Sequence, residues 1–198
     1  MKKIAHRGIH KNGIKENSLK AFECAIKRKD YEGFEFDIRT SKDGVFFVHH
    51  NVLIDGKIMN LIESKELITT YELTTLEEVL KINTEKIMLL EIKEPNLDYN
   101  NFIKIIEKYP NTNLYIDSFD NKIIHKLKGK THAKIGVLNY ILNSEESYQD
   151  YDFLGLMSPI MTENLYQYFK KQGKEIFIYA NRKNPENKYP EAYYIVDE

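Results

Sequence analysis

The stretch GFEFDIRTSKDGVFFVHH, residues 33–50, decides how the strands of this chain are arranged. It contains two β-rich runs, 33–39 and 44–50, and the Asp43-Gly44 pair between them is a strong signal for a tight hairpin turn. We therefore predict that 44–50 folds back antiparallel to 33–39 as a β-hairpin excursion. This run is then not one of the strands of the main parallel sheet.

Strand-like and helix-like segments alternate along the rest of the chain, which predicts a parallel α/β fold. Outside the hairpin excursion there are eight predicted strands, the number that closes a (β/α)8 barrel. The strands are 3–8, 33–39, 86–93, 113–120, 134–139, 152–157, 175–181 and 192–197. The predicted amphipathic helices are 17–29, 74–83, 99–109, 121–129 and 161–173.

The predicted fold is therefore a small (β/α)8 TIM barrel. A length of 198 residues is at the lower edge for this fold, and no helix follows the last strand, so we also expect trimmed helices or an open barrel. No internal repeat, low-complexity tract or Pro/Gly/Ser-rich linker divides the sequence. We expect one domain over residues 1–198.

Composition excludes several classes of protein. A net charge of -1 provides no overall attraction to nucleic acid or to an anionic membrane. No segment approaches the roughly 20 apolar residues of a membrane span, and the N-terminus lacks the apolar region of a signal peptide. Cys24 is the only cysteine, which excludes an internal disulfide framework. We expect a cytoplasmic protein, and we find no signal for its oligomeric state.

Carboxylates stand on the inner faces of two predicted strands. In 33–39, Glu35 and Asp37 alternate with apolar side chains that face the other way, and Glu91 and Lys93 repeat this arrangement. Both groups come near the carboxyl ends of their strands, where barrels place their active sites. A set of three carboxylates selects a hard divalent cation, Mg²⁺ or Ca²⁺, rather than zinc.

Cations and histidines accompany these acids near the strand ends. Arg7 and Lys93 are suited to balance the charge of a phosphate, and Gly8 would clear room for it. His6 and the pair at 49–50 can exchange protons near neutral pH. Each residue taken singly has an ordinary structural explanation, but their coincidence indicates phosphodiester cleavage. One imidazole would accept the proton of the attacking hydroxyl, and the other would protonate the leaving alkoxide.

The order of short motifs resembles the glycerophosphodiester phosphodiesterase family along nearly the whole chain. HRG alone is a weak signal, but its combination with the later motifs in this order is specific. The motifs are HRG at 6–8, ENS at 16–18, GFEFDIRTSKDG at 33–44, VHHN at 48–51, TTLEEVL at 74–80, LLEIK at 89–93 and IDSFD at 116–120.

The resemblance implies a phosphoric diester hydrolase that converts a glycerophosphodiester, a small-molecule substrate, to an alcohol and glycerol 3-phosphate. It also implies one bound divalent cation. Carried over motif by motif, the implied catalytic residues are His6 and His50, the implied phosphate contacts are Arg7 and Lys93, and the implied metal ligands are Glu35, Asp37 and Glu91.

The second catalytic histidine has two candidates. The family carries a His-Asp pair at a fixed distance after the Asp-Gly turn, and without a gap this spacing assigns the histidine to His50 and puts Asn51 where Asp is usual. His49 would require a deletion of one residue. Because adjacent side chains of a strand face opposite sides, only one of them can serve, and we assign His50.

Two alternatives to this function stay open at the level of sequence. A phospholipase-like enzyme would cleave a lipid or polymer phosphodiester and would need an exposed apolar rim, for which Phe46, Phe47 and Tyr166 are ambiguous candidates. A non-catalytic barrel would bind a phosphate ligand without cleaving it, and Asn51 favours this reading. Retention of both imidazoles and all three acids favours the enzyme.

Overall fold

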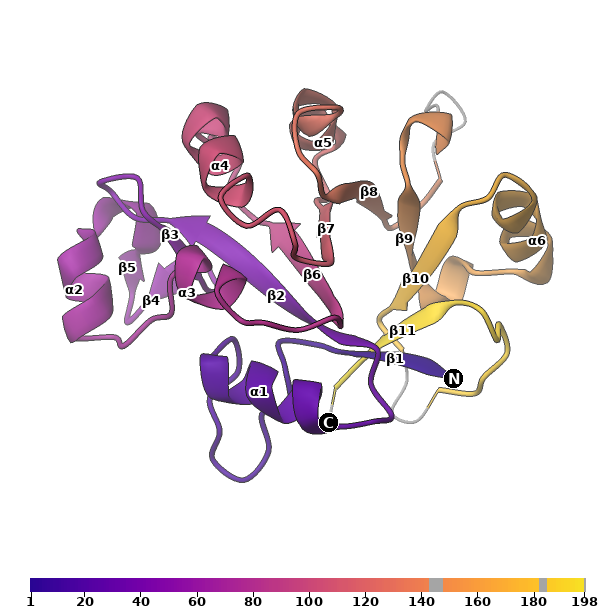
Figure 1. Cartoon of the computed structure of the whole chain (residues 1–198), viewed down its shortest axis with the longest axis horizontal. Helices are drawn as coiled ribbons and strands as arrows, with labels where there is room; N and C mark the ends of the chain where they lie inside the picture. Colours follow the sequence, from indigo (N-terminus) through magenta and orange to yellow (C-terminus); the bar gives the residue numbers. More distant parts are fainter. Residues whose placement is uncertain (143–147, 182–184, 198) are drawn as a thin grey trace.

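The computed structural model describes residues 1–142, 148–181 and 185–197. Eight parallel strands in these residues form a closed barrel, because β1 pairs with both β2 and β11. This confirms the predicted (β/α)8 fold (Figure 1). The strands are β1 (Lys2–Ala5), β2 (Gly33–Thr40), β6 (Ile87–Ile92), β7 (Leu114–Asp117), β8 (Lys134–Asn139), β9 (Phe153–Met157), β10 (Glu175–Tyr179) and β11 (Tyr193–Val196).

The hairpin excursion is also present. Strand β3 (Phe46–Val48) runs antiparallel to β2, with Ile38 opposite Val48, and it ends before the two histidines. The next segments were not predicted from the sequence, because their apolar runs are too short to show a period. They are β4 (Leu53–Ile54), β5 (Lys57–Ile58), the 3₁₀ turn η1 (Met59–Leu61) and α2 (Ser64–Thr69).

Helices cover the outside of the barrel, and five of the described helices overlap the predicted ones (Figure 1). They are α1 (Leu19–Lys27), α3 (Leu76–Leu80), α4 (Tyr99–Ile106), α5 (Asn121–Leu127) and α6 (Glu163–Lys171). Between β8 and β9, the described residues contain only the 3₁₀ turn η2 (Tyr148–Asp150). Between β9 and β10, the 3₁₀ turn η3 (Ser158–Ile160) precedes α6. The helical layer is thus trimmed, as 198 residues suggest. Every described helix is too short or too polar to cross a membrane.

Helix starts are fixed by local polar contacts. The Ser18 hydroxyl accepts a hydrogen bond from the backbone N–H of Ala21 and caps α1. Thr75 and Glu78 form a reciprocal capping box at the start of α3, in which each side chain accepts from the other residue's backbone N–H. Of these two helices, α1 packs on β2, which carries Glu35 and Asp37, and α3 packs on β3.

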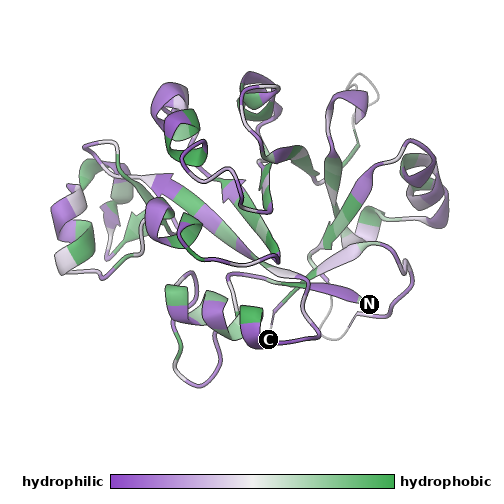
Figure 2. Ribbon diagram, in the orientation of Figure 1, coloured by the Kyte–Doolittle hydropathy of each residue, from purple (hydrophilic) through white to green (hydrophobic). Residues whose placement is uncertain are grey.

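The alternation along β2 separates an outer core from the barrel interior. Phe34, Phe36 and Ile38 pack outward, and the Phe34 ring stacks on Phe22 of α1 with centroids 4.7 Å apart. Figure 2 shows this alternation as hydrophobic and hydrophilic bands along β2. The barrel interior has its own apolar cluster, made by Ile4, Ile87, Leu89, Tyr115, Phe153, Phe177 and Ile195. The acids of β2 therefore point into the barrel.

Close strand approach makes a glycine obligatory in β2. A methyl group at Gly33 would come within 2.1 Å of the carbonyl oxygen of Ile87 on β6. At Gly155 the nearest atom, 2.2 Å away, is instead a terminal methyl carbon of the Leu138 side chain, which can change rotamer. We expect Gly33→Ala to lower the free energy of unfolding by about 3 kcal/mol, and Gly155→Ala by about 1 kcal/mol, in urea denaturation. Equal losses would contradict this reading of the β2–β6 contact.

Candidate active site

Strand register lines up three carboxyl groups inside the barrel. Asp37 of β2 lies opposite Glu91 of β6, and Glu91 lies opposite Asp117 of β7. All three residues are buried, with Asp37 fully so. They stand near the carboxyl ends of their strands, so the acids form a row across three neighbouring strands on the catalytic side of a barrel.

Glu35, Asp37 and Glu91 fit a hard divalent cation. Each offers an oxygen atom, and these atoms all lie within 4.8 Å of one another. Asp37 Oδ1 is buried and accepts no hydrogen bond, and Glu91 Oε1 is buried against Lys93. Their counter-charge is the Lys93 ammonium, 2.5 Å from Glu91 Oε1 and 3.4 Å from Asp37 Oδ1. An all-oxygen donor set with unused lone pairs is the kind of site that Mg²⁺ or Ca²⁺ prefers.

Crowding and burial shift the proton affinities of these acids. Burial, reinforced by Asp37 and Glu91, raises the pKa of Glu35 well above its usual value. Burial also raises the pKa of Glu91 to about 7, although Lys93 opposes the shift. The pKa of Asp117 is raised well above its usual value by burial and then by Glu91. In the absence of a bound cation, these carboxyl groups keep their protons at pH values at which ordinary carboxyl groups are ionised.

Arg7 is held under the acid cluster by an unusual backbone conformation. Its φ of 54° is left-handed, and its N–H donates to Glu35 Oε2 at 3.0 Å. The guanidinium Nε lies 3.4 Å from Asp37 Oδ2, and another guanidinium nitrogen donates to Glu16 Oε1 at 3.0 Å. Asn17 also donates its side-chain N–H to Asp37 Oδ2 at 2.9 Å. Residues 16 and 17 of the ENS motif thus orient Arg7 and Asp37.

The expectation that Gly8 clears room for phosphate is wrong. A Cβ at Gly8 would lie 2.7 Å from both the carbonyl carbon and the Cβ of Ala21 in α1. Gly8 also has a φ of 76°, which favours glycine. This glycine is required because α1 packs directly on the turn that follows β1.

His6 is anchored by a residue from the other end of the chain. Its Nδ1 lies 2.5 Å from Oδ1 of Asp197, and its Nε2 lies 3.9 Å from Oε2 of Glu35. An ionised carboxylate only accepts hydrogen bonds, so Nδ1 carries the proton that Asp197 receives. Nε2 is left as the atom that can gain or lose a proton beside the acid cluster.

The two adjacent histidines have different surroundings. His50 Nδ1 lies 2.9 Å from Oδ1 of Asn51, which can orient the ring as the more usual Asp would. His49 Nε2 is buried without a hydrogen-bond partner, and burial lowers the pKa of this histidine. Arg39 donates to the carbonyl oxygens of His50, at 2.8 Å, and of Lys93, at 3.3 Å. Arg39 therefore ties the turn that carries His50 to the end of β6.

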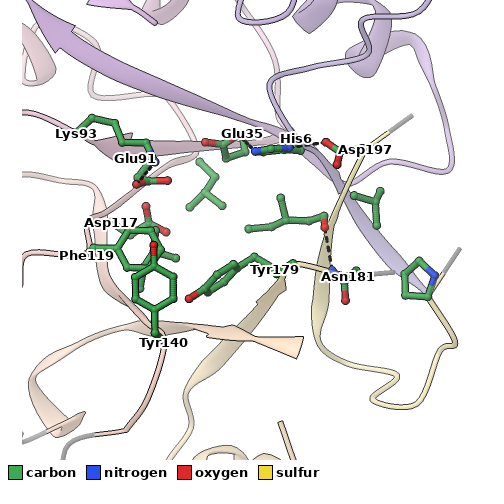
Figure 3. Close-up of a pocket in the computed structure, with 16 residues that line it drawn as sticks. His6, Glu35, Glu91, Lys93, Asp117, Phe119, Tyr140, Tyr179, Asn181 and Asp197 are labelled. Atoms are coloured by element: carbon green, nitrogen blue, oxygen red, sulfur yellow. Dashed lines mark hydrogen bonds and ion pairs between the residues drawn. The ribbon is translucent and has the colours of Figure 1, made fainter. Parts of the chain in front are cut away.

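A cavity of about 580 Å³ opens beside these groups (Figure 3). Of the predicted site residues, His6, Glu35, Glu91 and Lys93 line it, whereas Arg7, Asp37 and His50 are not among its lining residues. The wall also includes Asp117, Phe119, Tyr140, Tyr179, Asn181 and Asp197, to which the sequence patterns assign no role. Asp117 could be found by aligning the carboxyl ends of β6 and β7, but no local signal marks Asp197.

Comparison with known proteins identifies the family. The sequence profile of the Glycerophosphoryl diester phosphodiesterase family matches residues 6–189. The chain belongs to this family. It is accordingly a phosphoric diester hydrolase, and the motif resemblance is confirmed. No curated protein matches the chain.

Solved structures of glycerophosphodiester phosphodiesterases share the fold. The enzyme from Thermotoga maritima is 26% identical, with a TM-score of 0.78 over 98% of this chain and 93% of that one. The enzyme from Parabacteroides distasonis is 20% identical, with a TM-score of 0.80 over 99% and 92% of the two chains. An Oleispira antarctica phosphodiesterase, solved with the product sn-glycerol-3-phosphate, is 15% identical, with a TM-score of 0.76 over 100% and 92%.

The raised pKa of Glu35 predicts how the metal-free enzyme responds to pH. Above pH 4.5 the folded state binds this proton more tightly than the unfolded chain, so the free energy of unfolding decreases as pH rises. At pH 8 without metal, we expect Glu35→Gln to unfold about 3 °C higher than the wild type by calorimetry.

Addition of Mg²⁺ or Ca²⁺ should reverse this order. The wild type gains stability from the bound ion, about 2.7 kcal/mol at a hundredfold excess over Kd, and Glu35→Gln gains little. Glu23→Gln, on the exposed face of α1, is the matched control and should behave like the wild type. A Glu35→Gln protein that is less stable than the wild type without metal would contradict the burial effect.

Proposed function

We propose that this enzyme hydrolyses a glycerophosphodiester to an alcohol and glycerol 3-phosphate in a reaction that depends on one divalent cation. The observation that carries the proposal is the convergence of Glu35, Asp37 and Glu91 in one cluster, of which Glu35 and Glu91 line the same cavity as His6. The product bound to the Oleispira antarctica relative supports glycerol 3-phosphate as the product here.

Glu35, Asp37 and Glu91 would hold one Mg²⁺ or Ca²⁺. When bound, the ion would neutralise phosphate charge and polarise a phosphoryl oxygen. Lys93 lines the cavity and would contact the phosphate directly, since its ammonium has three donors and only two neighbouring carboxylates. Arg7 does not line the cavity, but its guanidinium lies beside Asp37 and has five donors, so it would be the second phosphate contact, from below the acid cluster.

His6 and His50 would move the protons of the reaction. One imidazole accepts the proton of water or of a neighbouring glycerol hydroxyl as that oxygen attacks phosphorus, and the other protonates the alcohol oxygen as its bond to phosphorus breaks. Asp197 fixes the orientation of the His6 ring through Nδ1. His50 is favoured over His49 because the Nε2 atom of His49 is enclosed and cannot reach a substrate.

Substitution of each histidine tests these roles. We expect His6→Ala and His50→Ala to lower kcat/KM for glycerophosphocholine at least about a hundredfold, because each removes one proton-transfer step. His49→Ala is the matched control, and we expect it to stay within about tenfold of the wild type. Release of glycerol 3-phosphate is the measurement, and thermal unfolding checks that each variant is folded.

Chelation separates metal dependence from histidine function. Treatment with a chelator should abolish glycerol 3-phosphate release, and re-addition of Mg²⁺ or Ca²⁺ should restore it. Full activity in both His6→Ala and Glu35→Gln would show that the assignment of the site is wrong.

The structure bears differently on the two alternatives. Phe46, Phe47 and Tyr166 are buried, so they supply no exposed apolar rim for a phospholipase-like enzyme. Val52 and Leu53, which follow His50 closely in the chain, are about half exposed and favour this as the second candidate. Hydrolysis of a lysophospholipid in preference to glycerophosphocholine would establish it. A non-catalytic binder would hold glycerophosphocholine in calorimetry without releasing glycerol 3-phosphate.

A further inference from the structure

Asp117 is a buried carboxyl group that the proposed reaction does not use. It ends β7 and lies opposite Glu91 of β6 in the parallel register. Its side chain lines the cavity, and neither of its oxygens accepts a hydrogen bond. Among the buried carboxyl groups of the described residues, it alone has both oxygens enclosed and without a donor. An enclosed acceptor without a donor is unfavourable, so a donor within reach should be drawn to Asp117.

The Lys93 ammonium is such a donor. Its Nζ lies 2.5 Å from Oε1 of Glu91, 3.4 Å from Oδ1 of Asp37 and 5.7 Å from the centre of the Phe119 ring. Figure 3 shows Asp117 between Glu91 and Phe119. Burial and then Glu91 raise the pKa of Asp117, whereas Lys93 lowers it, so the ammonium already acts on this carboxyl group.

The present position of Lys93 is incompatible with a loaded metal site. Its two partners, Asp37 and Glu91, are among the three carboxylates that would hold the ion. An oxygen that accepts from the ammonium cannot offer the same lone pair to a metal, and two cations this close repel each other. Lys93 must therefore leave Glu91 when the site is loaded. Its stem is flexible, but its side chain is only 17% exposed, so the ammonium needs another acceptor inside the cavity.

We propose that Asp117 is the second acceptor for Lys93, whose ammonium moves from Glu91 to Asp117 when the cation site is loaded. This rests on the proposed function, since it concerns the residues around the same metal site. Next to Asp117 the ammonium would keep a donor for the phosphate, because it carries three N–H bonds. The face of Phe119 would favour the same position through a cation–π contact. Asp117 is then a positioning residue that acts through Lys93, and it is not a metal ligand.

A double-mutant cycle tests this inference through metal affinity. Mn²⁺ binding is measured by calorimetry in the wild type, in Asp117→Asn, in Lys93→Met and in the protein with both substitutions. We expect Asp117→Asn to weaken Mn²⁺ binding about tenfold when Lys93 is present, because the displaced ammonium loses its acceptor. In the Lys93→Met background, the same substitution should change the Kd less than about twofold, because there is no ammonium to place.

Glu23→Gln is the matched control for the loss of one negative charge. Glu23 is exposed on α1 and lies outside the cavity wall, so its substitution should leave the Kd at the wild-type value. An equal effect of Asp117→Asn in both backgrounds would show that Asp117 acts on the ion directly or through folding. That result would overturn the inference and leave the proposed function intact. If the wild type binds no Mn²⁺, the proposed metal site is wrong and the inference falls with it.

Crystals of the wild type soaked in Mn²⁺ test the same movement without a substitution. We expect Lys93 Nζ to lie within about 3 Å of a carboxylate oxygen of Asp117 when the ion is bound. A loaded site in which the ammonium stays on Glu91, or turns out to solvent, would contradict the inference.

Discussion

The side-by-side burial of carboxyl groups at the register of β2, β6 and β7 is the constraint on which the site depends. Asp37, Glu91 and Asp117 share one level of the barrel, and Glu35 lies one inward position below Asp37. Burial of like charges is unfavourable unless cations or protons balance them. Without a bound metal ion, this negative charge is balanced by Lys93, by Arg7 and by the proton that Glu35 retains because its pKa is raised. A bound dication would balance the charge more completely.

Closure of the barrel is what assembles the rest of the site. The pairing of β1 with β11 sets Ala5 opposite Val196, and the His6 backbone N–H donates to the Val196 carbonyl at 3.0 Å. His6 and Asp197 therefore meet only when the first and last strands are joined. On the other side, Arg39 joins the turn that carries His50 to the end of β6. The proton-transfer groups thus depend on the same fold that buries the acids.

Much of the fold was accessible from the sequence because its signals are local. The Asp-Gly turn separated the hairpin from the eight barrel strands, and alternation in β2 placed Glu35 and Asp37 on the inner face. The short β4–β5 pair escaped prediction, because two-residue strands show no periodicity. The packing role of Gly8 was also missed, because it depends on contact with α1 and not on neighbouring residues. Asp197 was missed for the same reason, since its partner is 191 residues away.

The most direct test of the acid cluster is X-ray diffraction from crystals soaked in Mn²⁺, measured at the manganese absorption edge. We expect one strong anomalous peak in the cavity, about 2.0–2.6 Å from carboxylate oxygens of Glu35, Asp37 and Glu91, with the Lys93 ammonium moved away from Glu91. An anomalous map without a peak between these three residues, with Lys93 still in contact with Glu91, would contradict the assignment of a metal site.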